Sequence, residues 1–260
     1  MLIDSHAHLG MSQFDKDRRE VVGRALEGGI QFIFTVGTDV ASSRQAVALS
    51  HDHPSVHAVV GIHPHNTKDI DRESLRQMRQ IARDSNVRAY GEIGLDFFRN
   101  LSPPEIQITM FRKQIRLAKD LGLPVVIHDR EADREMLNIL QEEGGGEDSL
   151  QAVIHCFSGD LIMAEQCLEK GFYLSVPGTV TFPKAQLLKE VVRQIPLERF
   201  MIETDCPFLA PEPFRGRRNE PAYVRYTAEA IAHIKGLSLK EVAEATSRTA
   251  LKFFRMEDAS

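Results

Sequence analysis

The sequence predicts an α/β fold of the closed (β/α)8 TIM-barrel type. Eight short apolar runs alternate along the chain with longer segments whose apolar residues recur at helical spacing. The length of 260 residues matches the roughly 250 residues of such a barrel. No glycine-rich phosphate turn follows the first run, although an open doubly wound sheet often has one there. We therefore expect one barrel domain that spans residues 1–260.

The apolar runs give the predicted strands, which lie at 1–6, 31–36, 56–63, 87–92, 124–128, 151–155, 172–176 and 200–205. The intervening segments predict helices, among them 15–27, 75–84, 105–121, 133–142, 161–169 and 185–194. The tail from 221 to 254 predicts two more helices that help to close the ring, with a break at Gly236 and a capping box from Ser238 to Glu241. Gly144 to Gly146, followed by Glu147 and Asp148, predicts a surface loop.

The amino-acid composition excludes several classes of function and of site. With 32 Lys and Arg against 37 Asp and Glu, the net charge is −5, which is too acidic for a protein that coats nucleic acid over a broad face. The three cysteines show no CxxC spacing, so a disulfide framework and a structural zinc knuckle are not indicated. No run approaches the roughly 20 apolar residues of a membrane span. We expect a cytoplasmic protein without membrane contact, and the oligomeric state stays open.

Histidines and carboxylates gather at the carboxyl ends of six predicted strands. In a parallel barrel these ends meet at one rim, where enzymes of this fold carry their sites. A single histidine after a strand is commonly a polar residue at the edge of a core. Several histidines and carboxylates from separate strands at one rim are costly to desolvate unless a cation lies among them. The candidate metal ligands are His6, His8, Glu92, His128, His155 and Asp205.

Six ligands are too many for one open catalytic ion, which commonly takes about three. They suit two divalent cations, with Mg²⁺, Mn²⁺ or Zn²⁺ as candidates. The economical arrangement gives His6, His8 and Asp205 to one ion, His128 and His155 to the other, and lets Glu92 bridge them. Two ions about 3.5–4 Å apart can share an activated water and support phosphoester hydrolysis. Because Glu92 stands where related binuclear hydrolases often carry a carboxylated lysine, that variant is not expected.

Several residues have more than one candidate role. Asp205 can serve as ligand, as proton acceptor, or as both at different steps. Glu203 is either a partner that orients a histidine, which we favour, or a general base. His63 and His65 are candidates for contact with a phosphate or a leaving group.

The loop that follows the last strand carries Arg217, Arg218 and Asn219, which are either solvated or hold an anionic backbone. Phe97, Phe98 and Phe157 either stack on a base or pack their loops.

Seven segments together resemble the TatD family of metal-dependent deoxyribonucleases. They are DSHAH at 4–8, GIHPH at 61–65, GEIGLD at 91–96, PVVIH at 124–128, HCFSG at 155–159, ETDCP at 203–207 and RGRRNEP at 215–221. The resemblance implies a cytoplasmic barrel hydrolase that acts on DNA, often as a 3′-to-5′ exonuclease. It also implies one metal on His6, His8, Glu92 and Asp205, a second on Glu92, His128 and His155, and phosphate contact by His63.

The leading hypothesis is a metal-dependent phosphodiester hydrolase, a deoxyribonuclease of the 3′-to-5′ exonuclease kind, that uses two divalent cations and an activated water. Its catalytic residues would be Asp205, Glu92, His63 and Glu203, with His63, His65, Arg217, Arg218 and Asn219 binding the substrate. A small-molecule amidase or lactonase on the same metals is an alternative. From a different class, a non-catalytic metal-dependent scaffold that binds nucleic acid or a protein also stays open, although an intact ligand set argues against it.

Overall fold

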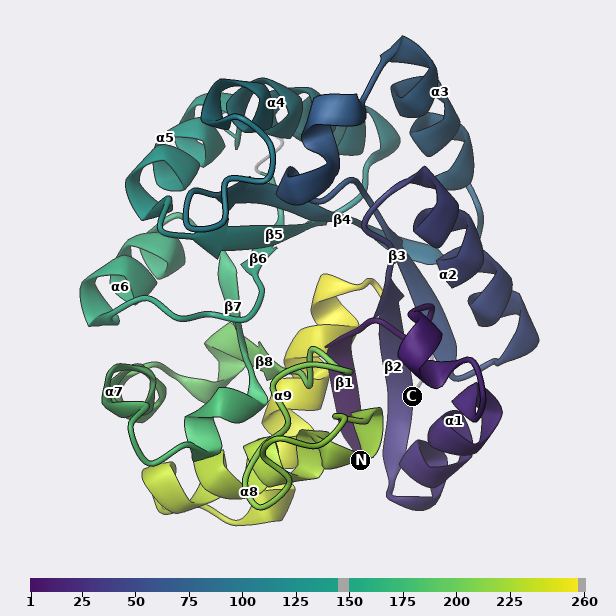
Figure 1. The fold of residues 1–260 in the computed structure, drawn as a ribbon. Coiled ribbons are helices and arrows are strands. Elements are labelled where there is room, and N and C mark those ends of the chain that lie inside the picture. The colour runs from purple at the N-terminus through teal and green to yellow at the C-terminus, as the bar shows by residue number, and fades with distance from the viewer. Residues whose placement is uncertain (145–149, 257–260) are drawn as a thin grey trace.

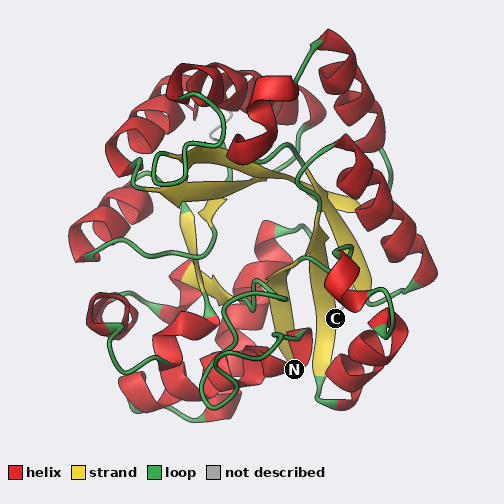
Figure 2. Ribbon diagram, viewed as in Figure 1, coloured by secondary structure: helices red, strands yellow, loops and turns green. Residues whose placement is uncertain are grey.

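The computed structural model describes residues 1–144 and 150–256, and its centre is a sheet of eight parallel strands (Figures 1 and 2). The strands follow one another in chain order around the sheet, as the alternating pattern predicts. Their bounds are β1 (Leu2–Ala7), β2 (Ile30–Val36), β3 (Val56–Val60), β4 (Val87–Asp96), β5 (Val125–Arg130), β6 (Ala152–Ile154), β7 (Tyr173–Val176) and β8 (Phe200–Ile202).

A bridge between the first and last strands brings the ends of the sheet together. Ala7, the last residue of β1, pairs in parallel with Cys206, four residues beyond the end of β8. The sheet is therefore a nearly closed barrel, as predicted. Strands β3, β6 and β8 end earlier than the apolar runs suggested, so His63, His155 and Asp205 lie in the loops that follow them.

Helices surround the barrel (Figure 2). Their bounds are α1 (Arg18–Glu27), α2 (Val40–Asp52), α3 (Arg72–Ile81), α4 (Pro104–Leu121), α5 (Asp133–Gly144), α6 (Leu161–Glu169), α7 (Gln186–Gln194), α8 (Val224–Lys235) and α9 (Leu239–Phe253). Short 3₁₀ turns join several of them, such as η1 (Ser12–Phe14) and η2 (Pro64–Asp69). The expected loop lies outside the described residues except for Gly144, which ends α5.

Helices α1 and α3 start three residues away from their predicted positions. Helix α3 begins at Arg72 rather than at residue 75. Helix α1 begins at Arg18 rather than at residue 15, because η1 occupies the preceding turn. Helix α2 was not among the predicted helices. The Asp39 side chain accepts from the backbone N–H of Ser42 at 2.7 Å, and the Ser42 hydroxyl accepts from the backbone N–H of Asp39. This reciprocal cap starts α2.

The apolar side chains form two cores, and α9 helps to build the inner one. Alternate strand residues face outward against the ring of helices, and the others, such as Ile3, Val59 and Met201, face inward. Phe253 and Phe254 at the end of α9 belong to the inner core. The Phe254 ring stacks on the ring of Phe34 in β2, with ring centres 3.6 Å apart. Helix α9 therefore packs in both cores, since Val242 and Ala243 near its start belong to the outer one and its end packs against the barrel interior.

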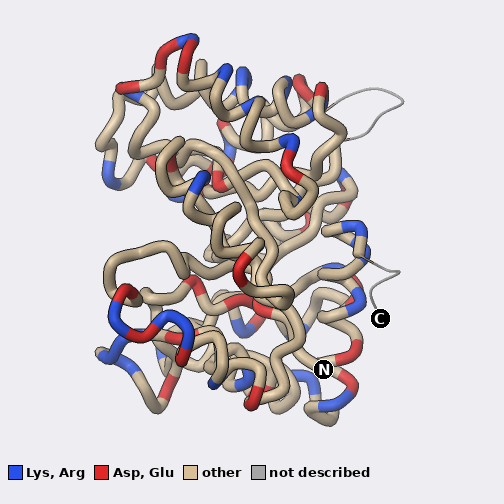
Figure 3. Tube along the Cα trace, turned by 90° about the vertical axis from the view of Figure 1, so that its right-hand side faces the viewer, with Lys and Arg blue, Asp and Glu red and all other residues tan. Residues whose placement is uncertain are grey.

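Charge is mixed over the surface. Figure 3 shows Lys and Arg interspersed with Asp and Glu along the chain trace. This distribution agrees with the net charge of −5 and favours local contact with any polyanion. Within the described residues, no helix combines the length and apolar character that crossing a bilayer requires.

Candidate metal centre

The six predicted metal ligands meet at the carboxyl end of the barrel. His6 and His8 come from the end of β1, Glu92 from β4 and His128 from β5, and His155 and Asp205 follow β6 and β8. Their donor atoms group tightly: the nitrogen or oxygen atoms of His6, His8 and Asp205 all lie within 4.8 Å of one another, as do those of His63, Glu92 and His128. The strand order therefore assembles donors that are almost 200 positions apart in the sequence.

Glu92 lies between two sets of histidines and offers a different oxygen to each. Its Oε2 is 3.6 Å from His6 Nε2 and 3.7 Å from His8 Nε2. Its Oε1 is 2.8 Å from His128 Nδ1 and 2.7 Å from His155 Nε2. The carboxylate is almost completely buried, with 3% of its side chain exposed. This is the arrangement that a bridging carboxylate between two cations requires.

The orientation of His8 fits a metal ligand. Its Nδ1 lies 3.1 Å from the carbonyl oxygen of Val36, and since a carbonyl only accepts, Nδ1 carries the proton of the neutral ring. Nε2 is then an acceptor, and it lies 3.3 Å from the Asp205 carboxylate. Two acceptors this close to each other are stabilised by a proton or a cation near both. The His and carboxylate donors are those that divalent metals take in catalytic sites.

Charge coupling within the cluster is strong. Burial by itself lowers the pKa of His155, but the carboxylates of Glu92 and Glu203 outweigh it and hold that pKa well above its ordinary value. Burial likewise raises the pKa of Glu92, yet the charges of His155 and His63 and the hydrogen bonds from His128 and His155 hold it well below its ordinary value. Glu92 is thus an anion in the barrel rim, and positive charge is drawn to the histidines around it.

His63 is oriented as a donor rather than as a ligand. Its Nδ1 accepts from the backbone N–H of His65 at 3.0 Å, so the proton of the neutral ring is on Nε2. Nε2 points into the cluster, 3.4 Å from Glu92 Oε1. Burial lowers the pKa of His63 to about 4, although the Glu92 charge opposes this, and the ring is therefore neutral at pH 7. A neutral N–H aimed into the cluster suits the contact with phosphate or leaving group considered above.

Glu203 is buried behind His155. Its side chain is completely covered, its Oε1 accepts from the backbone N–H of Cys156 at 2.7 Å, and the same oxygen is 3.4 Å from His155 Nδ1. The residue is not part of the cleft lining. This geometry favours the orienting role over that of a general base. Asp205, by contrast, does line the cleft.

Asp96 is a site residue that sequence reasoning did not assign. Its Oδ2 lies 2.8 Å from His65 Nε2 and 3.2 Å from His128 Nε2, so it connects these two histidines. Burial raises the pKa of Asp96, but the hydrogen bonds from His128 and the Arg99 backbone outweigh it and hold the carboxyl ionised. Because residues two apart on a strand share a face, the spacing from Glu92 to Asp96 was a signal that could have found it.

Two of the three predicted substrate residues in the last loop make contacts within the chain. Arg218 donates to both oxygens of Asp17, at 2.7 and 2.6 Å, and to Glu220 at 3.0 Å. The buried Asn219 amide donates to the carbonyls of Thr204 and Phe208. Arg217 is exposed, and none of the three lines the cleft. The contacts favour a structural role for Arg218 and Asn219.

A cleft of about 590 Å³ opens over the cluster. The metal-ligand candidates His8, Glu92, His128, His155 and Asp205 form its floor together with His63 and His65, while Met11, Phe208 and Leu209 line one side. Arg99 and Arg130 also line it, and sequence reasoning missed both. The signal was their position, since Arg130 follows the candidate ligand His128 by two residues and Arg99 lies in the loop after the strand that carries Glu92.

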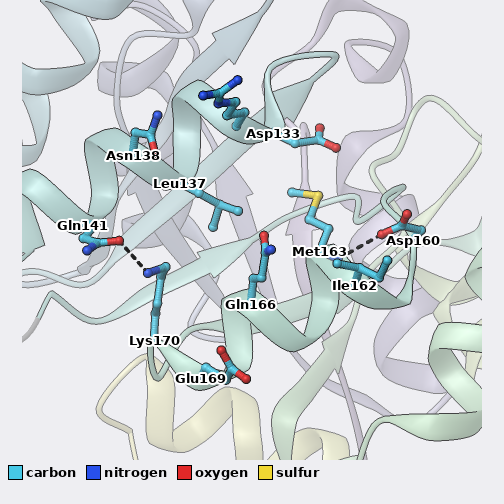
Figure 4. A pocket seen from close by; sticks show the side chains of 11 residues that line it. Asp133, Leu137, Asn138, Gln141, Asp160, Ile162, Met163, Gln166, Glu169 and Lys170 are labelled. Carbon is cyan, nitrogen blue, oxygen red and sulfur yellow. Dashed lines mark hydrogen bonds between the residues drawn. The ribbon is translucent and has the colours of Figure 1, made fainter.

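A second hollow of about 550 Å³ lies outside the barrel between α5 and α6 (Figure 4). None of the candidate ligands lines it. Some of its polar groups are engaged locally, since Lys170 donates to Gln141 at 2.8 Å and Asp160 caps α6 through Met163. The cleft at the barrel rim, rather than this groove, therefore combines a cavity with reactive side chains.

Comparison with known proteins agrees with this geometry. A family model described as TatD related DNase matches residues 3–255. This chain belongs to the TatD family. Like other TatD proteins it is a metal-dependent hydrolase, and its histidine and carboxylate clusters are candidate metal-binding groups.

Relatives in the TatD family match over nearly their whole length. The chain is 42% identical to an uncharacterized metal-dependent hydrolase, YabD of Bacillus subtilis, over 98% of this chain and 100% of that protein. It is 37% identical to the 3′-5′ ssDNA/RNA exonuclease TatD of Citrobacter rodentium, over 97% of each chain. The crystal structure of YjjV, a TatD homologue from Escherichia coli, superposes with a TM-score of 0.91 at 28% identity and 98% coverage of both chains.

Proposed function

We propose that this TatD protein hydrolyses the phosphodiester bonds of DNA from the 3′ end and holds two divalent cations in its barrel rim. The observation that carries the proposal is the placement of Glu92, whose two oxygens face two separate sets of histidines. A relative that is 37% identical is named a 3′-5′ ssDNA/RNA exonuclease, which supports nucleic acid as the substrate class.

His6, His8, Glu92 and Asp205 would hold one cation, and Glu92, His128 and His155 the other. Bound there, Mg²⁺, Mn²⁺ or Zn²⁺ would polarise a phosphodiester and lower the pKa of a water molecule at the site. Val36 and Glu203 fix the His8 and His155 rings by contacts at 3.1 and 3.4 Å, so that the ligand nitrogens stay aimed at the cluster.

Asp205 is the candidate proton acceptor. Burial raises its pKa, but the hydrogen bond and charge of His8 outweigh this and hold that pKa below its ordinary value, so the carboxylate is ionised at neutral pH. Asp205 lines the cleft, whereas Glu203 does not. His63 would donate its Nε2 proton to a phosphate oxygen, while His65, held by Asp96 at 2.8 Å, would contact the phosphate or the leaving group.

The test is hydrolysis of single-stranded oligonucleotides labelled at the 3′ or the 5′ end, with Mg²⁺, Mn²⁺ and Zn²⁺ in turn. We expect stepwise loss from the 3′ end, and we expect Glu92→Gln to abolish it because the amide cannot bridge two cations. Glu105→Gln, on the exposed first turn of α4, is the matched control. An active Glu92→Gln protein would overturn the two-cation centre, and hydrolysis of amides or lactones without any nucleic acid cleavage would favour the alternative substrate class.

A further inference from the structure

An exposed aromatic ring, Phe98, lies beside Arg130, an arginine that lines the cleft. Phe98 lies two residues beyond β4 and is 53% exposed. The guanidinium carbon of Arg130, the last residue of β5, lies 4.5 Å from the centre of the Phe98 ring. The guanidinium therefore covers one face of the ring and leaves the other accessible.

Local backbone bonds hold this pair in place. The N–H of Phe97 donates to the carbonyl of Arg130 at 2.9 Å, which continues the pairing of β4 with β5. The N–H of Arg99 donates to the Asp96 carboxylate at 2.7 Å, and the Asn100 side chain donates to the carbonyl of Phe97 at 2.6 Å. The turn is thus fastened to Asp96, the same carboxylate that contacts His65 and His128.

The position of Arg130 relates it to the metal centre. Arg130 follows His128 by two residues on the same strand, which spaces them by about 6.6 Å along β5 and points both side chains to the same side. Arg130 lines the cleft together with His128, as does Arg99. Within the described part of the chain, neither arginine forms an ion pair with a carboxylate, whereas Arg218 is paired with Asp17 and Glu220.

The other two candidate rings do not offer a surface. Phe157 is 2% exposed, and Phe97 is partly buried against the outer core. Phe208, which does line the cleft, is 45% exposed, and it contacts His8 edge to face with ring centres 6.3 Å apart. Among these rings, Phe98 combines exposure with an arginine over its face.

We propose that Phe98 and Arg130 form a nucleotide subsite for a single strand, in which a base stacks on the open face of Phe98 and Arg130 binds the adjoining phosphate. Stacking uses the face of the guanidinium, which leaves its N–H edge to donate to phosphate oxygens. Bases in a duplex have their faces covered by neighbouring bases, so this subsite favours single strands. The proposal rests on the proposed function for the identity of the substrate.

Binding tests the subsite without relying on turnover. The protein loaded with Mg²⁺ is titrated into a fluorescent single strand with phosphorothioate linkages, which resist hydrolysis, and anisotropy gives the Kd. Base stacking on an aromatic side chain is worth about 1–3 kcal/mol, so we expect Phe98→Ala to raise the Kd about 5-fold or more. Phe98→Trp should keep tight binding. Arg130→Ala should flatten the dependence of log Kd on log salt by about 0.7.

Phe182 supplies a matched control, because Arg215 lies over its ring at 4.6 Å and neither residue lines the cleft. We expect Phe182→Ala to bind as the wild type does. The loss caused by Phe98→Ala should disappear on a strand without bases. Equal Kd values for Phe98→Ala and Phe182→Ala, or no binding by the wild type at millimolar protein, would overturn the subsite. Binding that depends on Phe98 without cleavage of normal strands would uphold the subsite and overturn the proposed hydrolysis.

Discussion

The backbone N–H of Asp205 donates to the carbonyl of His6 at 2.9 Å. Just beyond it, the N–H of His8 donates to the carbonyl of Cys206 at 2.7 Å, and Ala7 pairs with Cys206 between them. The backbone bonds that close the barrel are therefore made by three of the candidate metal ligands themselves. Closure of the sheet thus brings the candidate metal ligands His6, His8 and Asp205 together.

Replacement of Asp205 should separate its chemical role from its structural one. Asp205 has a φ of +56°, a left-handed conformation that asparagine tolerates almost as well as aspartate. We expect Asp205→Asn to fold normally and to lose activity about 100-fold or more, because the amide neither accepts a proton nor carries charge. Activity and thermal unfolding should be measured on the same preparation. Activity close to that of the wild type would remove Asp205 from the mechanism.

Glu203→Gln should weaken metal binding rather than proton transfer. The variant keeps an oxygen for the N–H of Cys156 but loses the negative charge beside His155. Loss of such a supporting carboxylate typically costs about 10- to 100-fold in metal affinity or activity. We expect a higher metal concentration to restore most of the rate. A rate that stays low at saturating metal would instead indicate that Glu203 acts as a general base.

Metal binding should release protons. Burial lowers the pKa of His128, but the hydrogen bonds of His128 to Asp96 and Glu92 outweigh burial, so that this pKa is raised. The pKa of His155 is raised well above its usual value. Because a cation takes the neutral ring, both histidines must lose any proton first. Metal affinity should therefore rise with pH up to the raised pKa values and level off above them. Calorimetry in buffers of different ionisation enthalpy counts the protons, and none released at neutral pH would contradict the coupling.

Glycine at position 94 should be essential to the register of β4 against β5. Gly94 has a φ of +146°, and a Cβ there would lie 2.0 Å from the carbonyl oxygen of His128. We expect Gly94→Ala to lower the melting temperature and to displace His128, with loss of metal binding. Gly23→Ala in α1 is the control, because a Cβ there meets nothing within 4 Å. A Gly94→Ala protein as stable as the control would show that the strands can shift.

Arg218 should contribute to stability more than to substrate binding. It joins Asp17 to Glu220, and its guanidinium carbon lies 4.9 Å from the centre of the Phe14 ring. Since Arg218 is about a third exposed, we expect Arg218→Ala to lower the free energy of unfolding by only about 1 kcal/mol. Arg217 is the exposed neighbour, and Arg217→Ala should leave the free energy of unfolding unchanged. An increased KM at unchanged melting temperature would instead indicate that Arg218 contacts the substrate.

Much of the site could be predicted because the barrel topology converts a one-dimensional pattern into a spatial one. His6, Glu92 and His155 each stand at or just beyond the end of an apolar run, and parallel strands place all such ends on one rim. The position of α2 was harder to recognise, since its apolar face is weakly marked and its start depends on the reciprocal cap of Asp39 and Ser42. The single domain over 1–260 and the cytoplasmic location stay predictions.

The sequence by itself determined the fold class, the family and the types of donor atom at the rim, because strand periodicity and strand ends are local properties of the chain. Only the tertiary structure decided which of the neighbouring charges face the cleft. Arg218 is paired with Asp17, 201 positions away, while Arg99 and Arg130 line the cleft. Side-chain direction depends on partners that folding brings from distant segments, and spacing along the chain carries no record of them.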